Sequence, residues 1–153
     1  KIKSLVLGGH GDSMVAMLGS TEVDGKKIND LVKEGRLSKD KLNQIVDRTK
    51  KGGAEIVKFL EKGSAFYAPA ASGVEMAECY LKDLKKQLPC AVYLNGEYGA
   101  KDIYAGVPVI IGSDGVEKII ELELSNEEKT NFEKSIEAVK ELFSAAKNID
   151  PSL

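Results

Sequence analysis

The chain has 153 residues, of which 42% are hydrophobic and 30% charged, a composition typical of one soluble globular domain with a core of its own. Its 22 basic and 24 acidic side chains leave a net charge of −2, which argues against a nucleic-acid-binding surface. The apolar runs are too short to cross a membrane and no signal peptide is visible, so we expect a cytoplasmic protein without a membrane partner.

The first part of the chain predicts short strands and one short helix. Residues 2–7 are typical of a strand that enters a glycine-rich loop, and the Asp-Gly pair at 24–25 predicts a tight hairpin turn. A helix is predicted over 28–34, ending near Gly35. The sequence begins with Lys1 instead of methionine, next to strand-like residues, which favours a fragment or a processed product.

A long helical pattern follows. Ser38 is a suitable N-cap for a helix whose apolar residues recur every three or four positions as far as Leu60. Gly52 and Gly53 interrupt this pattern at a cost of about 2 kcal/mol relative to alanine. The glycine pair therefore predicts a kink or close packing against another element.

A second helical pattern leads into the predicted sheet. Its apolar residues run from 74 to 88, and Pro89 should end the helix because proline cannot continue it. Residues 90–94 alternate like a strand, and residues 106–111 and 116–124 are typical of a hairpin. Polar residues alternate with apolar ones in the last segment, which indicates a sheet with one solvated face.

The last segment predicts a long amphipathic helix. Ser125 and Glu128 have the spacing of a capping box at its start. One face carries the apolar residues Phe132, Ile136, Val139, Phe143 and Ala146. Because the predicted strands cluster in hairpins between long helices, without βαβ alternation, we expect an α+β fold with a mostly antiparallel sheet packed with long helices.

His10 is the single histidine of the chain, and it lies in a glycine-rich loop after an apolar run. Imidazole titrates near neutral pH, so His10 is the leading candidate for proton transfer. The flanking glycines allow a tight turn and a close approach to another group, and Asp12 has the spacing to orient the ring or to close the turn. The alternative is structural: His10 satisfies the turn or caps a buried carbonyl.

Other functional readings of the loop and of a second small-residue stretch stay open. The loop has glycines that can cradle phosphate, but neither phosphate-binding glycine motif, Gly-x-Gly-x-x-Gly or Gly-x-x-x-x-Gly-Lys-Ser/Thr, is present. Residues 63–70 combine small residues with two aromatics, which suits either a pocket wall that attracts anions or an ordinary helix start. Cys79 and Cys90 lack metal-site spacing, so we expect free thiols and no metal.

Four separated motifs resemble the lactate/malate dehydrogenase family. They are residues 8–15 (GGHGDSMV), 52–57 (GGAEIV), 63–70 (GSAFYAPA) and 88–90 (LPC). The first resembles the family's catalytic-histidine signature, and the others are most similar to the lactate-dehydrogenase-like malate dehydrogenases. The resemblance runs from residue 5 to the end in unbroken order and covers the C-terminal half of the family, whose C-terminal domain is α+β with a mostly antiparallel sheet.

The resemblance implies an NAD-dependent interconversion of malate and oxaloacetate, a 2-hydroxy and a 2-oxo dicarboxylate, with His10 as proton acceptor and donor. It places Ala65 and Ser64 in the substrate pocket and Pro69 near the nicotinamide. Residues 1–153 would form the substrate domain, inactive alone, while an N-terminal Rossmann domain supplies most of the NAD site. A homodimer or homotetramer is implied. The alternatives are L-lactate dehydrogenase and a non-catalytic oligomerisation module derived from a dehydrogenase.

Overall fold

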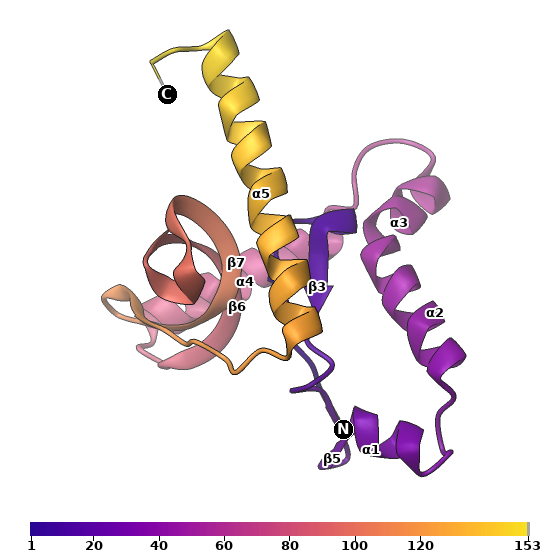
Figure 1. Cartoon of the computed structure of the whole chain (residues 1–153). Helices are drawn as coiled ribbons and strands as arrows, with labels where there is room; N and C mark the ends of the chain where they lie inside the picture. Colours follow the sequence, from indigo (N-terminus) through magenta and orange to yellow (C-terminus); the bar gives the residue numbers. More distant parts are fainter. Residues whose placement is uncertain (153) are drawn as a thin grey trace.

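The computed structural model describes residues 1–152 and contains two antiparallel sheets with helices around them (Figure 1). A small sheet has the strand order β1-β4-β5, from Ile2–Lys3, Glu22–Val23 and Lys26–Lys27. The larger sheet has the order β3-β2-β7-β6, from Met14–Ala16, Val6–Gly8, Lys101–Gly112 and Lys86–Asn95. The strand β8, Gly115–Ile119, pairs with β7. All strand pairings among residues 1–152 are antiparallel, so the predicted α+β class is confirmed.

The five α-helices are α1 (Ile28–Lys33), α2 (Lys39–Lys50), α3 (Gly52–Leu60), α4 (Tyr67–Leu81) and α5 (Asn126–Ile149). In Figure 1, α5 crosses in front of the larger sheet and α4 lies behind it. The predicted caps are present: the hydroxyl of Ser38 accepts a hydrogen bond from the Lys41 amide at 3.2 Å, and Ser125 and Glu128 form a complete capping box. The helical pattern breaks at Lys51, as the glycine pair predicted.

The core lies between the larger sheet and the helices that cover it. β7 is its centre, because β6 pairs along one of its edges while β2 and β8 pair with the other. The buried apolar side chains include Leu7, Met17, Leu94, Val107, Val109, Phe132 and Ile136. Phe143, predicted on the core face of the last helix, is exposed, since α5 extends past the sheet there (Figure 1).

Several predicted boundaries are wrong. The segment 2–7 splits into β1 and β2, which belong to different sheets. The second helical pattern does not continue to 88: α4 ends at Leu81, and Asp83 and Lys85 adopt positive φ values of 48° and 49° that no α-helix accommodates. Pro89 lies inside β6 opposite Pro108, where neither residue has an N–H to donate across the pair.

The predicted strand over 116–124 ends early, at Ile119. Ile120 still donates its N–H to the Pro108 carbonyl at 2.8 Å, but beyond it the Tyr98 hydroxyl replaces a neighbouring strand. That hydroxyl donates to the Ile120 carbonyl at 2.6 Å and accepts from the Leu122 amide at 3.0 Å. The backbone hydrogen bonds of Ile120 and Leu122 are therefore made with a side chain. The alternating sequence pattern of a strand gives no sign of such a partner.

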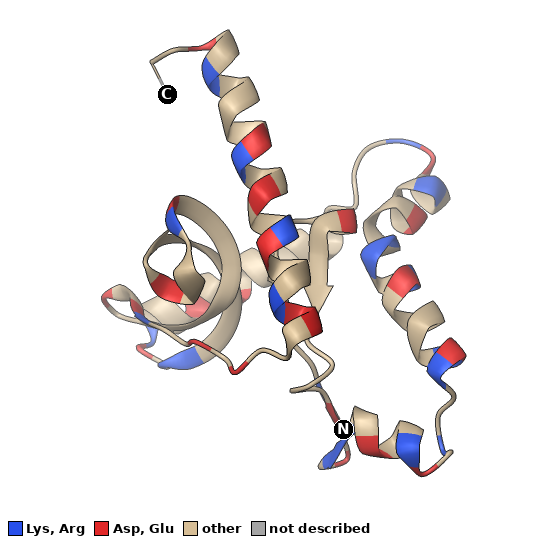
Figure 2. Ribbon diagram, in the orientation of Figure 1, with Lys and Arg blue, Asp and Glu red and all other residues tan. Residues whose placement is uncertain are grey.

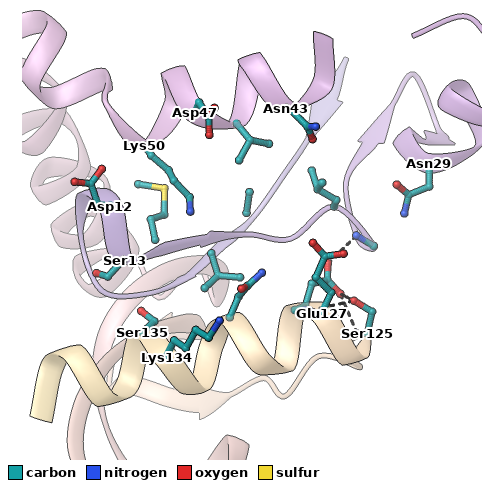
Figure 3. A pocket seen from close by; sticks show the side chains of 18 residues that line it. Asp12, Ser13, Asn29, Asn43, Asp47, Lys50, Ser125, Glu127, Lys134 and Ser135 are labelled. Atoms are coloured by element: carbon teal, nitrogen blue, oxygen red, sulfur yellow. Dashed lines mark hydrogen bonds between the residues drawn. The ribbon is translucent and has the colours of Figure 1, made fainter. Parts of the chain in front are cut away.

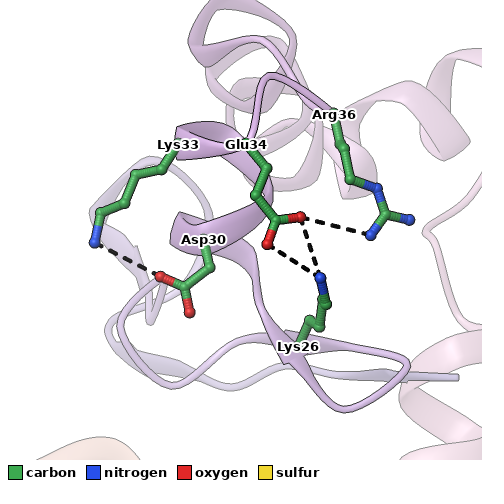
Figure 4. A network of polar contacts seen from close by, with 5 residues as sticks. All are labelled: Lys26, Asp30, Lys33, Glu34 and Arg36. Atoms are coloured by element: carbon green, nitrogen blue, oxygen red, sulfur yellow. Dashed lines mark hydrogen bonds and ion pairs between the residues drawn. The ribbon is translucent and has the colours of Figure 1, made fainter.

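The β4–β5 hairpin turns at Asp24 and Gly25, both at positive φ, as the Asp-Gly pair predicted. An exposed ion network ties this hairpin to α1 (Figure 4). In it, the Lys26 amine donates to both carboxylate oxygens of Glu34, at 3.0 and 3.2 Å, while Arg36 lies 3.8 Å from the same carboxylate. Exposed pairs of this kind contribute only about 0–1 kcal/mol each.

Basic and acidic residues are interspersed along α2 and α5 (Figure 2). None of the helices among residues 1–152 has both the length and the apolar composition needed to cross a bilayer.

Candidate active site

The glycine-rich loop joins β2 to β3, two antiparallel neighbours in the larger sheet. Gly8 and Gly11 have φ values of 87° and 68°, a left-handed region that glycine adopts without steric cost. His10 lies between them in an extended conformation, and its side chain is exposed. The loop thus presents one imidazole at the surface of the domain.

Three contacts hold the loop in place. Gly8 pairs with Gly106 of β7, the central strand. The Gly9 amide donates a 2.8 Å hydrogen bond to the hydroxyl of Ser135 on α5. The Ser13 hydroxyl donates to the His10 carbonyl at 3.2 Å. The backbone on both sides of His10 is therefore anchored, while its ring remains accessible.

No hydrogen bond reaches the His10 imidazole from any residue in the range 1–152. Asp12 is exposed in the short 3-10 turn that follows, Gly11–Ser13, and does not contact the ring through a hydrogen bond. A catalytic histidine works best when a second group fixes its orientation and tautomer. Within this chain, the loop positions the backbone of His10 but leaves the ring without such a partner.

The other predicted site residues lie on the segment that leads into α4. Ser64 is exposed and Ala65 half-buried, both between α3 and α4, and Pro69 is exposed in the first turn of α4. The rings of Phe66 and Tyr67 contact each other there in a tilted arrangement, with centroids 4.6 Å apart. Among the described residues, no hydrogen bond joins this segment to the His10 loop, so the roles of these three residues stay predictions.

Sequence reasoning missed a groove of about 630 Å³ between α2, α5 and β3 (Figure 3). Asp12 and Ser13 lie at one end of it, while Lys50 and Lys134 reach in from the two helices. Ser125 and Glu127 lie at the other end, and Glu128 also lines the groove. The groove brings together residues more than a hundred positions apart, so no local pattern could have indicated it.

Glu128 connects the start of α5 to the loop after β3. Its side chain is buried, and its carboxylate accepts hydrogen bonds from the Gly19 amide at 2.9 Å and from the Ser125 amide and hydroxyl at 2.9 and 2.8 Å. Burial raises the pKa of Glu128, but these hydrogen bonds to the ionised form outweigh it and bring the pKa below its ordinary value. The carboxylate is therefore ionised at neutral pH and acts as a structural clamp.

Ser135 and Gly106 contact the His10 loop, and neither was among the predicted site residues. Each left a signal: Ser135 is a polar residue on the apolar face between Phe132 and Ile136, and Gly106 is a glycine inside a predicted strand. A glycine inside a strand often marks a close approach of another backbone. Both signals were local, but the partner in each case lies on the distant His10 loop.

The loop at residues 8–13 lacks the geometry that binds the pyrophosphate of a dinucleotide. Binding of that kind needs a glycine turn between a strand and a helix whose N-terminal amides face the phosphates. Here the loop continues into a 3-10 turn of three residues and then into β3. Gly8 and Gly9 instead serve the packing of the loop against neighbouring elements.

The chain was compared with known proteins. The model of the lactate/malate dehydrogenase alpha/beta C-terminal domain matches residues 1–149. The chain belongs to this family. The resemblance in the four motifs is thus confirmed, and with it the expected C-terminal-domain fold.

Individual family members agree with this assignment. A malate dehydrogenase of Pelagibacter ubique is 63% identical over all 153 residues. The crystal structure of Cryptosporidium parvum malate dehydrogenase has a TM-score of 0.92 at 43% identity, covering 96% of this chain and 47% of that one. Lactate dehydrogenase from Eimeria maxima with NADH and oxamate also has a TM-score of 0.92, at 41% identity over 98% of this chain and 47% of that one. The chain spans about half the length of the curated relatives it matches, 48% of each.

Proposed function

We propose that this chain is the C-terminal, proton-transferring domain of an NAD-dependent malate dehydrogenase. The observation that carries the proposal is the exposed imidazole of His10 on a loop anchored by β7 and α5, in a chain 63% identical to a malate dehydrogenase. An anchored backbone with an accessible ring suits general acid–base chemistry, which contributes typically about 10²–10⁴-fold to a rate.

The proposed mechanism assigns one task to His10. Bound NAD would supply the acceptor for the hydride that leaves the carbon bearing the substrate hydroxyl. In malate oxidation, an imidazole nitrogen of His10 accepts the proton of that hydroxyl. In oxaloacetate reduction, the same nitrogen donates a proton to the carbonyl oxygen. The exposure of the ring leaves room for a small dicarboxylate beside it.

The remaining parts of the site are proposed from family membership. Ala65 and Ser64 would face the substrate, and Pro69 the nicotinamide. NAD would be held mainly by an N-terminal Rossmann domain, which would also supply the carboxylate that orients His10 and the arginine that binds the substrate. This division is supported by the free His10 ring and by relatives about twice as long. A cytoplasmic location stays a prediction.

The test is His10→Asn in the full-length protein. Asparagine keeps a polar side chain but cannot take up a proton near neutral pH, so turnover with malate and NAD should fall at least about 10²-fold. Binding of NADH, followed by its fluorescence, and the melting temperature should stay nearly unchanged. Turnover close to that of the wild type would show that another group carries the proton.

The full-length protein also allows a test of two other functions, lactate dehydrogenase activity and a non-catalytic role in oligomerisation. Lactate dehydrogenase activity is supported by the similarity to the Eimeria maxima enzyme, and a comparison of kcat/KM for malate and lactate decides between the two substrates. A non-catalytic module would form a stable homodimer or homotetramer without turnover. The exposed apolar side chains of α3 and α4, such as Phe59 and Leu81, support self-association in either case. The 153-residue chain alone is expected to be inactive.

A further inference from the structure

Ser135 is a buried polar residue on the face of α5 that packs against the sheet. Only 2% of its surface is exposed, and it lies between the core residues Phe132 and Ile136. Its hydroxyl accepts the 2.8 Å hydrogen bond from the Gly9 amide, across 126 positions of sequence. A buried hydroxyl costs stability unless it has a partner, so this position is specialised for the contact that it makes.

The loop backbone lies directly against this hydroxyl. A Cβ atom on Gly8 would lie 2.2 Å from the Ser135 oxygen, and a Cβ on Gly9 would lie 2.3 Å from the Ser13 oxygen. On the sheet side, a Cβ on Gly106 would lie 2.7 Å from the Gly8 carbonyl oxygen. Gly8 is thus enclosed between α5 and β7, and neither Gly8 nor Gly106 has room for a side chain.

The hydrogen bond from the Gly9 amide to Ser135 restrains a flexible part of the loop. Gly9 immediately precedes His10, and a glycine has more backbone freedom than any other residue. Ser135 fixes the peptide unit that joins Gly8 to Gly9, and Ser13 fixes the one that joins His10 to Gly11, so the short segment that carries His10 is held at both ends. Without the serine acceptor, the Gly8–Gly9 peptide unit would lose this restraint, and its rotation would move the imidazole relative to a bound substrate.

We propose that Ser135 is a positioning residue for His10, which it places through the Gly9 amide. This inference rests on the proposed acid–base role of His10. A misplacement of about 1 Å can cost on the order of 10²-fold in rate. The loss of one hydrogen bond should therefore lower kcat while substrate and cofactor binding elsewhere remain intact.

The experiment compares three variants of the full-length protein. Ser135→Ala removes the hydroxyl, and Ser135→Cys fills the same space with a much weaker acceptor. Val139→Ala is the matched control: Val139 lies one turn further along α5, and its side chain is 3.5 Å from the position that a Cβ on Gly9 would take. It loosens the packing against the loop without removing the hydrogen bond.

We expect both serine variants to lower kcat at least about tenfold while KM for NAD changes less than about twofold. Hydrogen exchange of the Gly9 amide should accelerate in both variants, while exchange in the rest of α5 stays as slow as in the wild type. Val139→Ala should lower the melting temperature with a kcat within about threefold of the wild type and slow exchange at Gly9.

The outcomes separate this inference from the proposed function. If Ser135→Cys keeps the kcat of the wild type, or if Gly9 exchange accelerates without a loss of kcat, Ser135 does not position His10. If Val139→Ala lowers kcat as much as the serine variants do, packing explains the effect and the proposal fails. If His10→Asn retains turnover, the acid–base assignment itself is wrong, whatever the serine variants show.

Discussion

Two regions of the molecule are held together in different ways. The sheet body, defined as β2, β3, β6, β7, β8 and α5, contains most of the buried side chains, and β7 alone contributes Ile103, Ala105, Val107, Val109 and Ile111. The helical arm, defined as residues 39–81 with α2, α3 and α4, buries only Leu42 and Cys79. The body has a core of its own, whereas the arm is covered on few of its sides.

The arm buries few side chains although it contains many apolar residues. Val74, Tyr80 and Leu81 of α4 are large and exposed, and α4 shows little separation between an apolar and a polar side. A helix that is apolar all round is typical of one covered on several sides. The arm therefore has the composition of an element that packs against neighbours outside the sheet body, as the proposed N-terminal domain or a second subunit would provide.

The largest expected effect distinguishes the two regions directly. Phe132 in the body is 2% exposed and packs at a tilt against the Tyr98 ring, with centroids 5.2 Å apart. Phe132→Ala should therefore lower the free energy of unfolding of this chain in urea by about 3–5 kcal/mol. Val74→Ala in the arm, at a side chain 68% exposed, should change the free energy of unfolding by less than about 0.5 kcal/mol. Equal losses would show that the arm has a core in this chain after all.

A smaller effect concerns the clamp between α5 and the loop after β3. Glu128→Gln removes a buried negative charge that accepts three hydrogen bonds, and we expect a loss of about 1.5–3 kcal/mol at neutral pH. Glu127→Gln is the control, because Glu127 shares the first turn of α5 but is exposed. If both variants lose the same stability, the effect comes from the helix dipole and not from the clamp.

The clamp also predicts a pH dependence. Burial raises the pKa of Glu128 and the hydrogen bonds lower it more, so its pKa is lower in the folded than in the unfolded state. A carboxyl of this kind contributes stability that is present above the unfolded pKa and is lost as the pH falls through the folded pKa. Below roughly pH 5, the melting temperature of the wild type should therefore converge on that of Glu128→Gln.

The sequence predicted the parts of the fold that depend on near neighbours. The caps at Ser38 and Ser125, the Asp24-Gly25 turn and the break near Gly52 each depend on a few consecutive residues, and all are present. The end of α4 does not depend on near neighbours. Leu88 fits the helical spacing, but it is buried in β6 because that strand pairs along β7, and this distant pairing overrides the local pattern.

For the candidate site too, the sequence predicted the local features and not the distant contacts. The glycines around His10 indicated a tight exposed loop, and the loop has the positive φ values that only glycine adopts readily. The contacts that hold it come from Gly106 and Ser135, which a sequence alone does not place beside residue 8. The sequence thus indicated His10 as the candidate for proton transfer, and the fold shows which residues hold its loop.

The smallest expected effect tests whether the arm is covered in the full-length protein. Gly73 lies in the interior of α4, and a Cβ added there meets no atom within 4 Å. In the 153-residue chain, Gly73→Ala should therefore stabilise by roughly 0.5–1 kcal/mol, through the lower backbone entropy of alanine in the unfolded state. In the full-length protein, a close neighbour on α4 would remove this gain or reverse it. Chemical denaturation of both proteins gives the comparison, and an equal gain in both would mean that this side of α4 stays open to solvent.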